Sequence, residues 1–137
     1  METGIKVGDC MEKSLVTVPD SANAAEAASK MASAKVSSLM VTDDAGKISA
    51  IVTETDLVRK ALAQGRADIT VKEMASTQLV TIPADADMAE AATLMGKRNV
   101  KKLVVTIDGK ISGIISHTDI IHIAPSLYEL TTKGKSA

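Results

Sequence analysis

The chain has 137 residues, of which 45% are hydrophobic and 24% are charged, and its formal net charge is −1 at pH 7. This length suits one ordinary domain, which can bury a core without help from disulfides or metal ions. A near-zero charge gives no general attraction to nucleic acid or anionic lipid, and a chain without Phe or Trp has no aromatic platform for unpaired bases. Composition therefore argues against a nucleic-acid partner.

The cysteine content and the N-terminal stretch indicate a cytoplasmic setting. Cys10 is the only cysteine, which excludes an intrachain disulfide and a multi-cysteine zinc site, and we expect a small buried thiol. Residues 1–9 mix charges with glycines and lack the apolar run of a signal peptide. No apolar run approaches the roughly 20 residues of a membrane span. We expect no membrane partner and no metal site.

The first predicted elements are a short strand and a helix. The run Leu15–Val18 favours a strand, which Pro19 ends because proline cannot donate to a ladder. A cap at Asp20 or Ser21 then begins a helix, whose apolar positions follow the spacing i, i+3, i+4, i+7. This predicted buried stripe comprises Ala24, Ala27, Ala28 and Met31.

A hairpin and a second helix follow. The segments 36–42 and 47–52 are rich in strand-forming residues and are joined by a polar turn that contains Gly46. A helix starts near Thr53 and runs to Gly65, a suitable residue just beyond a helix end. The segment 62–70 is predicted to be the linker to the second half of the chain.

The second half repeats the first. Residues 15–42 align with 79–106 at an offset of 64 with 14 identities in 28, and residues 46–58 align with 109–121 at an offset of 63 with 7 in 13. The second copy has the same predicted order: a strand at 79–82 that a proline ends, a cap at Asp85, a helix, a hairpin of 100–106 and 110–115, and a helix that starts near Ser116. Pro125 either ends this last helix early or displaces the residues that follow it. Its predicted stripe comprises Met88, Ala91, Ala92 and Met95. Each unit is therefore β-α-β-β-α.

The predicted domain organisation follows from this repeat. Repeat 1 spans residues 7–65, repeat 2 spans 71–124, and residues 125–137 form a C-terminal extension. The tail from Thr131 is small and polar, so we expect it to fray.

The sharpest local pattern lies where each hairpin meets its last helix, in the segments 50–56 (AIVTETD) and 113–119 (GIISHTD). Each has a hydroxyl residue just past the strand and an aspartate three positions later: Thr53 with Asp56, and Ser116 with Asp119. A capping box at a helix start accounts for this spacing. A ligand site accounts for it as well, because a helix N-terminus suits phosphate and a carboxylate accepts hydrogen bonds from a ribose diol.

These motifs resemble a CBS-domain pair, also called a Bateman module. The resemblance rests on the repeated unit, on the Thr-Val-Pro and Thr-Ile-Pro ends of the opening strands, and on the closing Thr/Ser-x-x-Asp signature, and it covers residues 7–124. It implies an α+β fold in which two β-α-β-β-α repeats pack sheet to sheet with pseudo-two-fold symmetry and leave two related clefts. It also implies a non-catalytic sensor of adenosine-containing ligands such as AMP, ADP, ATP or S-adenosylmethionine.

The resemblance also implies roles for individual residues. Asp56 and Asp119 would hold the ribose hydroxyls, while the surroundings of Thr17–Val18 and Thr81–Ile82 would flank the adenine. The remaining candidate nucleotide-binding residues are Ser38, Thr53, Thr55, Lys101, Lys102, Ser116, His117 and Thr118.

The two copies differ in charge at these positions. Lys101, Lys102 and His117 of the second copy align with Ser37, Ser38 and Glu54 of the first. Because lysines attract phosphate and a glutamate repels it, we expect the Ser116–Asp119 signature to form the principal nucleotide site. His122 is given no role.

Three functions compete at this stage. The leading hypothesis is a regulatory module that binds an adenine nucleotide, forms a homodimer and reports to a separate effector protein; no catalytic cofactor is expected. The second is a ligand-free dimerisation or adaptor unit whose signatures are only helix caps. The third, a small nucleotide hydrolase that uses His117 and Asp119, is disfavoured because the chain has no phosphate-binding glycine loop and no metal-ligand cluster.

Overall fold

The protein is described here from a computed structural model, which covers residues 2–132. These residues form two compact units. The continuous unit consists of residues 15–79, and the composite unit combines residues 2–14 with residues 80–132. Each unit contains one three-stranded mixed sheet with helices, so the predicted α+β class is confirmed.

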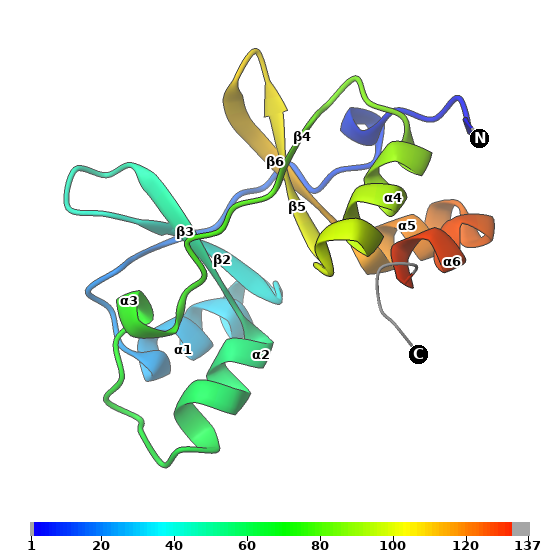
Figure 1. The fold of residues 1–137 in the computed structure, drawn as a ribbon. Helices are drawn as coiled ribbons and strands as arrows, with labels where there is room; N and C mark the ends of the chain where they lie inside the picture. The colour runs from blue at the N-terminus through cyan, green and yellow to red at the C-terminus, as the bar shows by residue number, and fades with distance from the viewer. Residues whose placement is uncertain (1, 133–137) are drawn as a thin grey trace. The chain divides into compact units, whose positions relative to one another are not determined.

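The continuous unit has the predicted order of elements (Figure 1). The sheet order is β1-β2-β3, with β1 parallel to β2 and β2 antiparallel to β3. The helix that follows β3 starts as α2 and continues in a π-helical stretch, η2, and it ends before Gly65, which has a positive φ of 65°. The elements are β1 (Thr17–Pro19), α1 (Ala24–Ala34), β2 (Ser38–Thr42), β3 (Ile48–Thr53), α2 (Glu54–Asp56), η2 (Leu57–Leu62) and α3 (Val71–Met74).

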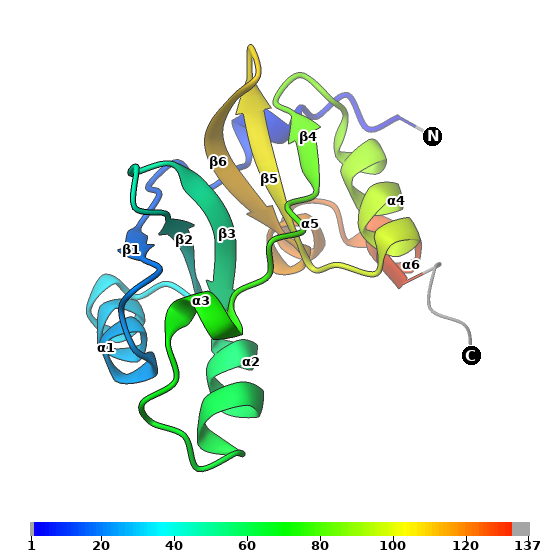
Figure 2. The same ribbon diagram turned by 60° about the vertical axis from the view of Figure 1, so that its left-hand side comes forward.

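The composite unit repeats this arrangement and adds two short helices at its C-terminal side (Figure 2). Its sheet order is β4-β5-β6, with the same parallel and antiparallel pairing. The predicted early end of α5 at Pro125 is confirmed. The elements are η1 (Val7–Asp9), β4 (Thr81–Pro83), α4 (Met88–Arg98), β5 (Lys102–Ile107), β6 (Lys110–Ser116), α5 (His117–Ile123), η3 (Pro125–Leu127) and α6 (Tyr128–Thr132).

The predicted helix caps were wrong by two or more positions. The N-caps are Asn23 for α1 and Asp87 for α4, in place of Asp20 or Ser21 and Asp85. The start is delayed because each strand is followed by a turn, in which the amide of the residue before the cap, Ala22 or Ala86, donates to the carbonyl of the strand's proline. Sequence propensity alone does not separate the acidic residues of such a turn from the cap itself.

Each unit is completed by the segment that precedes the other repeat in the sequence. In the composite unit, Val7 donates its amide hydrogen to the carbonyl of Ala86 at 2.9 Å; in the continuous unit, Val71 donates to Ala22 at 2.8 Å. Residues 2–14 and 66–78 are thus equivalent lead segments, related by the same offset of 64. The two repeats exchange these segments, and each unit of structure joins one repeat's lead segment to the other repeat's core.

This exchange changes the interpretation of the predicted linker. Ile69, near the end of the segment 62–70, is buried in the core of the continuous unit, and its carbonyl accepts a hydrogen bond from Ala24. The segment from Ile69 onward is therefore part of a folded unit and not a bare connection.

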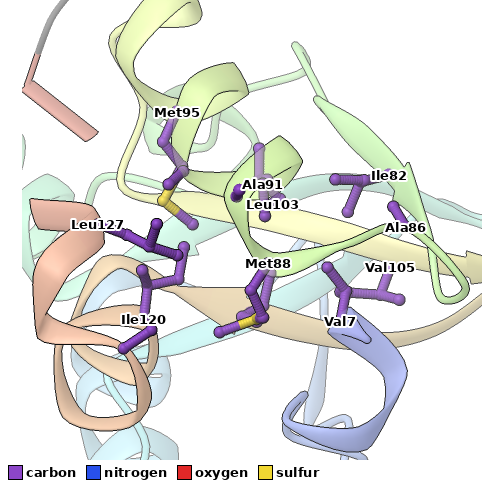
Figure 3. Close-up of a cluster of buried hydrophobic side chains, with 14 of the residues drawn as sticks. Val7, Ile82, Ala86, Met88, Ala91, Met95, Leu103, Val105, Ile120 and Leu127 are labelled. Atoms are coloured by element: carbon purple, nitrogen blue, oxygen red, sulfur yellow. The ribbon is translucent and has the colours of Figure 1, made fainter. Parts of the chain in front are cut away.

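The core of the composite unit lies between its sheet, α4 and the C-terminal helices (Figure 3). Leu127 is fully buried in it, and Thr131 is 4% exposed, so the prediction that the chain frays from Thr131 was wrong for Thr131 and Thr132. Residues 133–137 of that predicted tail lie outside the described residues. The short η3–α6 segment folds back because it packs on α4.

The two helical stripes are not equally covered. All four predicted positions are buried in α4, but in α1 Ala28 is exposed, which corrects the prediction for that residue. Its equivalent, Ala92, lies in the helix against which α6 packs. Residues 15–79 contain no counterpart of α6, so the matching face of α1 is left uncovered within its unit.

The side chains at the contact between the lead segment and the last strand of the sheet differ between the two units. In the composite unit, a Cβ added at Gly113 would lie 2.8 Å from the carbonyl oxygen of Glu12 and in collision with the side chain of Met11. At the equivalent positions of the continuous unit, Ala50 is buried and Ala75 packs against its core. The large Met11 and the small Gly113 of the composite unit are therefore replaced by two alanines, Ala75 and Ala50, in the continuous unit.

Asp87 fastens the N-terminal segment to the start of α4. Its carboxylate accepts hydrogen bonds from the amides of Ala89, Thr3 and Gly4, at 2.8 to 3.1 Å, and from the hydroxyl of Thr3 at 2.9 Å. The Ala89 amide, followed by the Thr3 and Gly4 donors, lowers the pKa of Asp87 to about 2. The equivalent cap in the continuous unit, Asn23, carries no charge and binds Glu26 reciprocally in a capping box.

We expect this difference to give the composite unit an acid-labile anchor. Because the pKa of Asp87 is depressed from 3.8, its stabilising contribution is present above about pH 4 and is lost as the pH falls toward 2. The thermal midpoint of the composite unit should fall in this window by more in the wild type than in Asp87→Asn. Parallel slopes for the two proteins, followed by circular dichroism between pH 5 and 2, would show that the anchor contributes nothing.

Candidate ligand-binding signatures

The signature of the continuous unit is a closed hydrogen-bonded ring at the start of α2. The Thr53 hydroxyl accepts from the amide of Asp56 at 3.2 Å, and Oδ2 of Asp56 accepts from the Thr53 amide at 3.0 Å. The Thr53 hydroxyl lies 3.2 Å from the same Oδ2 atom. The predicted capping box is therefore confirmed here.

The signature of the composite unit forms the same box at the start of α5. The Ser116 hydroxyl accepts from the Asp119 amide at 3.1 Å, and Oδ2 of Asp119 accepts from the Ser116 amide at 2.9 Å. No hydrogen bond or ion pair to Oδ1 of Asp119 is found among residues 2–132. One oxygen of this half-buried carboxylate can therefore accept from a ligand.

Asp56 differs from Asp119 in its second oxygen. Oδ1 of Asp56 lies 3.2 Å from Nζ of Lys60, one turn further along the same helix. Nζ also donates to the carbonyl oxygen of Met74 at 2.9 Å. Lys60 was missed in the sequence analysis, although its i, i+4 spacing from Asp56 is a recognisable signal. The equivalent residue beyond Asp119 is Ile123.

The hairpin register brings further predicted residues beside each signature. Ser38 pairs with Thr53, and Lys102 pairs with Ser116. The carbonyl of Lys101 accepts the amide hydrogen of His117 at 2.8 Å. The structure thus places the candidates of the middle strands next to the hydroxyl residue of each signature, and the Lys101 side chain is exposed there.

The opening strands contribute in a different way. Val18 and Ile82 are each 3% exposed and belong to the hydrophobic cores, so any ligand contact at these two positions would fall to their backbone. Thr17 is half-buried and pairs with Met40, while Thr81 is exposed and pairs with Val104. Thr17 and Thr81 lie on β1 and β4, and one strand, β2 or β5, separates them from the strand that leads into the signature of their own unit.

Thr55 and Thr118 occupy exposed positions in the first turns of α2 and α5. His117 is placed toward the C-terminal helix: its Nε2 lies 2.8 Å from the hydroxyl of Thr131, which donates to the carbonyl of Tyr128 at 2.6 Å. The rings of His117 and Tyr128 are 5.6 Å apart. A packing role for His117 against α6 was not anticipated from the sequence, because it depends on a contact 14 residues away.

Cys10 is coupled electrostatically to the second signature. Its thiol is half-buried instead of fully buried, which corrects the prediction. Burial first, and then the carboxylates of Asp9 and Asp119, raise the pKa of Cys10 above its usual value. This thiol therefore has little of the thiolate character that a nucleophile needs.

The part of the chain that the structure describes holds neither a metal cluster nor a membrane-crossing helix. Across residues 2–132, no three or more His, Cys, Asp or Glu side chains gather as a metal ion would require. No helix in the same range has the length and apolar character needed to cross a membrane.

Comparison with curated proteins finds relatives of archaeal origin. An uncharacterized protein of Methanopyrus kandleri is 28% identical over 126 residues, which cover 90% of this chain and 64% of that protein. The chain thus spans less than two thirds of this relative, and smaller shares of others.

Comparison with solved structures finds CBS-pair proteins with bound adenosine ligands. The CBS domain pair of protein MJ0100, in complex with 5′-methylthioadenosine and S-adenosyl-L-methionine, has a TM-score of 0.77 at 27% identity and covers 89% of this chain and 97% of that chain. The CBS domain protein PAE2072 from Pyrobaculum aerophilum, complexed with AMP, has a TM-score of 0.77 at 25% identity and covers 93% and 99%. The CBS domain model itself matches residues 7–63 and again residues 71–126. With two matches that span most of its length, and with the repeated fold described above, this chain belongs to the CBS domain family as a tandem pair.

Proposed function

We propose that this protein is a non-catalytic sensor that binds an adenosine-containing ligand of the AMP, ADP or ATP class through its Thr/Ser-x-x-Asp signatures. The observation that carries the proposal is the half-buried Asp119 carboxylate just beyond the end of β6, whose Oδ1 atom has no donor among residues 2–132. Its support from outside the chain is the AMP held by one structural relative and the adenosyl ligands held by another.

Each predicted residue except His117 has a definite task in this proposal. Asp119 accepts hydrogen bonds from the two ribose hydroxyls, and Ser116 and Thr118 lie near ribose and phosphate. Lys101 and Lys102 attract the phosphate by charge. The backbone beside Thr81 and Ile82 flanks the adenine. In the continuous unit, Asp56, Thr53, Thr55, Ser38 and the Thr17–Val18 backbone have the matching tasks.

A ligand-free adaptor is the second candidate, and the capping boxes favour it. Both signatures satisfy their helix starts by themselves, so the motif has a structural role even without a ligand. In either case we propose a homodimer that reports to a separate effector protein. A sensor of S-adenosylmethionine or NAD would use the same ribose-binding carboxylates.

Ligand binding is expected to stabilise the protein measurably. A ligand at one hundred times its dissociation constant raises the free energy of unfolding by about 2.7 kcal/mol, which moves the thermal midpoint by several degrees in a chain of this size. Thermal melting with millimolar AMP, ADP, ATP, NAD or S-adenosylmethionine checks this. No shift with any of them would favour the adaptor.

The Asp119→Asn variant is expected to weaken AMP binding by tenfold or more, because one hydrogen bond to a charged group contributes ~1.5–3 kcal/mol. The amide side chain can still cap α5, so the fold is retained. Asp56→Asn is the matched control and is expected to have the smaller effect in calorimetric titration. A larger loss from Asp56→Asn would contradict the assignment of the principal site.

A further inference from the structure

Asp56 and Asp119 occupy equivalent positions in the two repeats, but only Asp56 forms an ion pair among the described residues. Oδ2 of Asp56 is used by the capping box, and Oδ1 faces Nζ of Lys60. In the composite unit the box uses Oδ2 of Asp119 in the same way, but the equivalent of Lys60 is Ile123, which is 41% exposed. The difference at the second carboxylate oxygen therefore comes from one side chain at one repeat position.

Lys60 is held in place by two partners. The ammonium group donates to the carbonyl oxygen of Met74 at 2.9 Å while it pairs with Asp56 at 3.2 Å. Met74 is fully buried at the end of α3. This second anchor keeps the charge beside Oδ1 although the Lys60 side chain is 49% exposed. An incoming diol must therefore compete with a positioned donor.

The competition acts on the ribose hydroxyls because they need a carboxylate oxygen as acceptor. A lysine that already donates to Oδ1 draws charge density from that oxygen and occupies its approach. A half-exposed ion pair of this kind is a modest interaction. It is therefore expected to lower the ligand affinity of the Asp56 signature relative to the Asp119 signature, without abolishing binding. At Asp119, no cation competes among the described residues.

We propose that Lys60 is the specificity-determining residue that ranks the two signatures, by making Asp56 a weaker ribose acceptor than Asp119. This inference rests on the proposed function, since it concerns how strongly each signature binds the same adenosine ligand. It adds a cause within the continuous unit to the charge difference already expected from Lys101 and Lys102.

A reciprocal exchange of the two residues tests the inference. Lys60→Ile is expected to tighten AMP binding at the Asp56 signature by about two- to fivefold, and Ile123→Lys to weaken it at Asp119 by a similar factor. Both positions are partly exposed, so both variants should fold. Titration of AMP, followed by the backbone amide resonances of Asp56 and Asp119, gives a separate dissociation constant for each signature.

Two further variants separate charge from other effects. Lys60→Gln keeps a hydrogen-bond donor near Met74 but removes the charge, and it is expected to tighten the Asp56 signature as Lys60→Ile does. Arg59→Ile removes the neighbouring exposed cation of η2 and should change neither constant.

The possible failures are distinguishable. If AMP binds the wild type but the constants do not respond to Lys60→Ile or Ile123→Lys, the role of Lys60 is overturned and the proposed function stands. If neither amide responds to AMP, ATP or S-adenosylmethionine in the wild type, the proposed function is overturned, and this inference with it.

Discussion

Replacing Val7 by Asp is expected to unfold the composite unit selectively, whereas Val71→Asp is expected to unfold the continuous unit. Both valines are fully buried, and an unpaired charge in such a position costs several kcal/mol, about 3 or more. Because the lead segments are exchanged, each substitution damages the core of the repeat to which it does not belong in sequence. Hydrogen exchange at the amides of β2 and β5 measures the two units separately.

A chain without exchange would give the opposite result. Val7→Asp would then expose the amides of β2, and Val71→Asp those of β5. Lys13 is exposed and lies in the same lead segment as Val7, so Lys13→Asp is the control. It introduces a carboxylate into the segment at a position that stays in solvent, and it should leave both sets of amides protected.

Gly113→Ala is expected to destabilise the composite unit by ~1–3 kcal/mol, the usual cost of overpacking a filled site. The new Cβ would lie 2.8 Å from the carbonyl oxygen of Glu12. That carbonyl cannot move freely because it accepts the amide hydrogen of Ile114 at 3.0 Å. Chemical denaturation of the variant and the wild type measures the loss.

The continuous unit suggests how to relieve the collision that Gly113→Ala introduces. Its equivalent residues are Ala50 and Ala75, so the double variant Met11→Ala/Gly113→Ala copies an arrangement the fold already contains. Gly113→Ala should cost less in the Met11→Ala background than alone, with a coupling of about 0.5 kcal/mol or more in a double-mutant cycle. Strict additivity would show that Met11 is not what excludes a side chain at position 113.

Local signals in the sequence were sufficient for the elements themselves. Gly65 and Pro125 end their helices as predicted, and both hairpins form around glycines with positive φ. These features depend on backbone chemistry within a few residues, which a sequence displays directly. The helix starts were placed less well, because Asn23 and Asp87 compete with nearby acidic residues for the same role.

The segment exchange could not be derived from local propensity, since either core would accept the same apolar pattern. Ile5 and Val7 match Ile69 and Val71 at the repeat offset, so the equivalence of the two lead segments was visible in the sequence. Their destination was not, because it depends on contacts between residues far apart in the chain, such as Thr3 with Asp87 and Val71 with Ala22.

The candidate site likewise has local features that were predictable from the sequence and longer-range contacts that were not. The hydrogen bonds of Thr53 with Asp56 and of Ser116 with Asp119 are local, and their capping geometry was predicted. The engagement of His117 with Thr131 and the second anchor of Lys60 on Met74 join residues 14 apart, where helix and strand periodicity carry no information. The ligand assignment itself stays a prediction that the binding experiments test.

The placement of residues 2–14 has a consequence for the order in which the protein is built. All of the continuous unit has been synthesised once residue 79 is added, so its core can close while the ribosome is still at work. The lead segment emerges before the continuous unit, whereas its partners between Val80 and Leu127 emerge after that unit. Until then Val7 has no core to enter, and we expect the slowest folding step to be the docking of this lead segment.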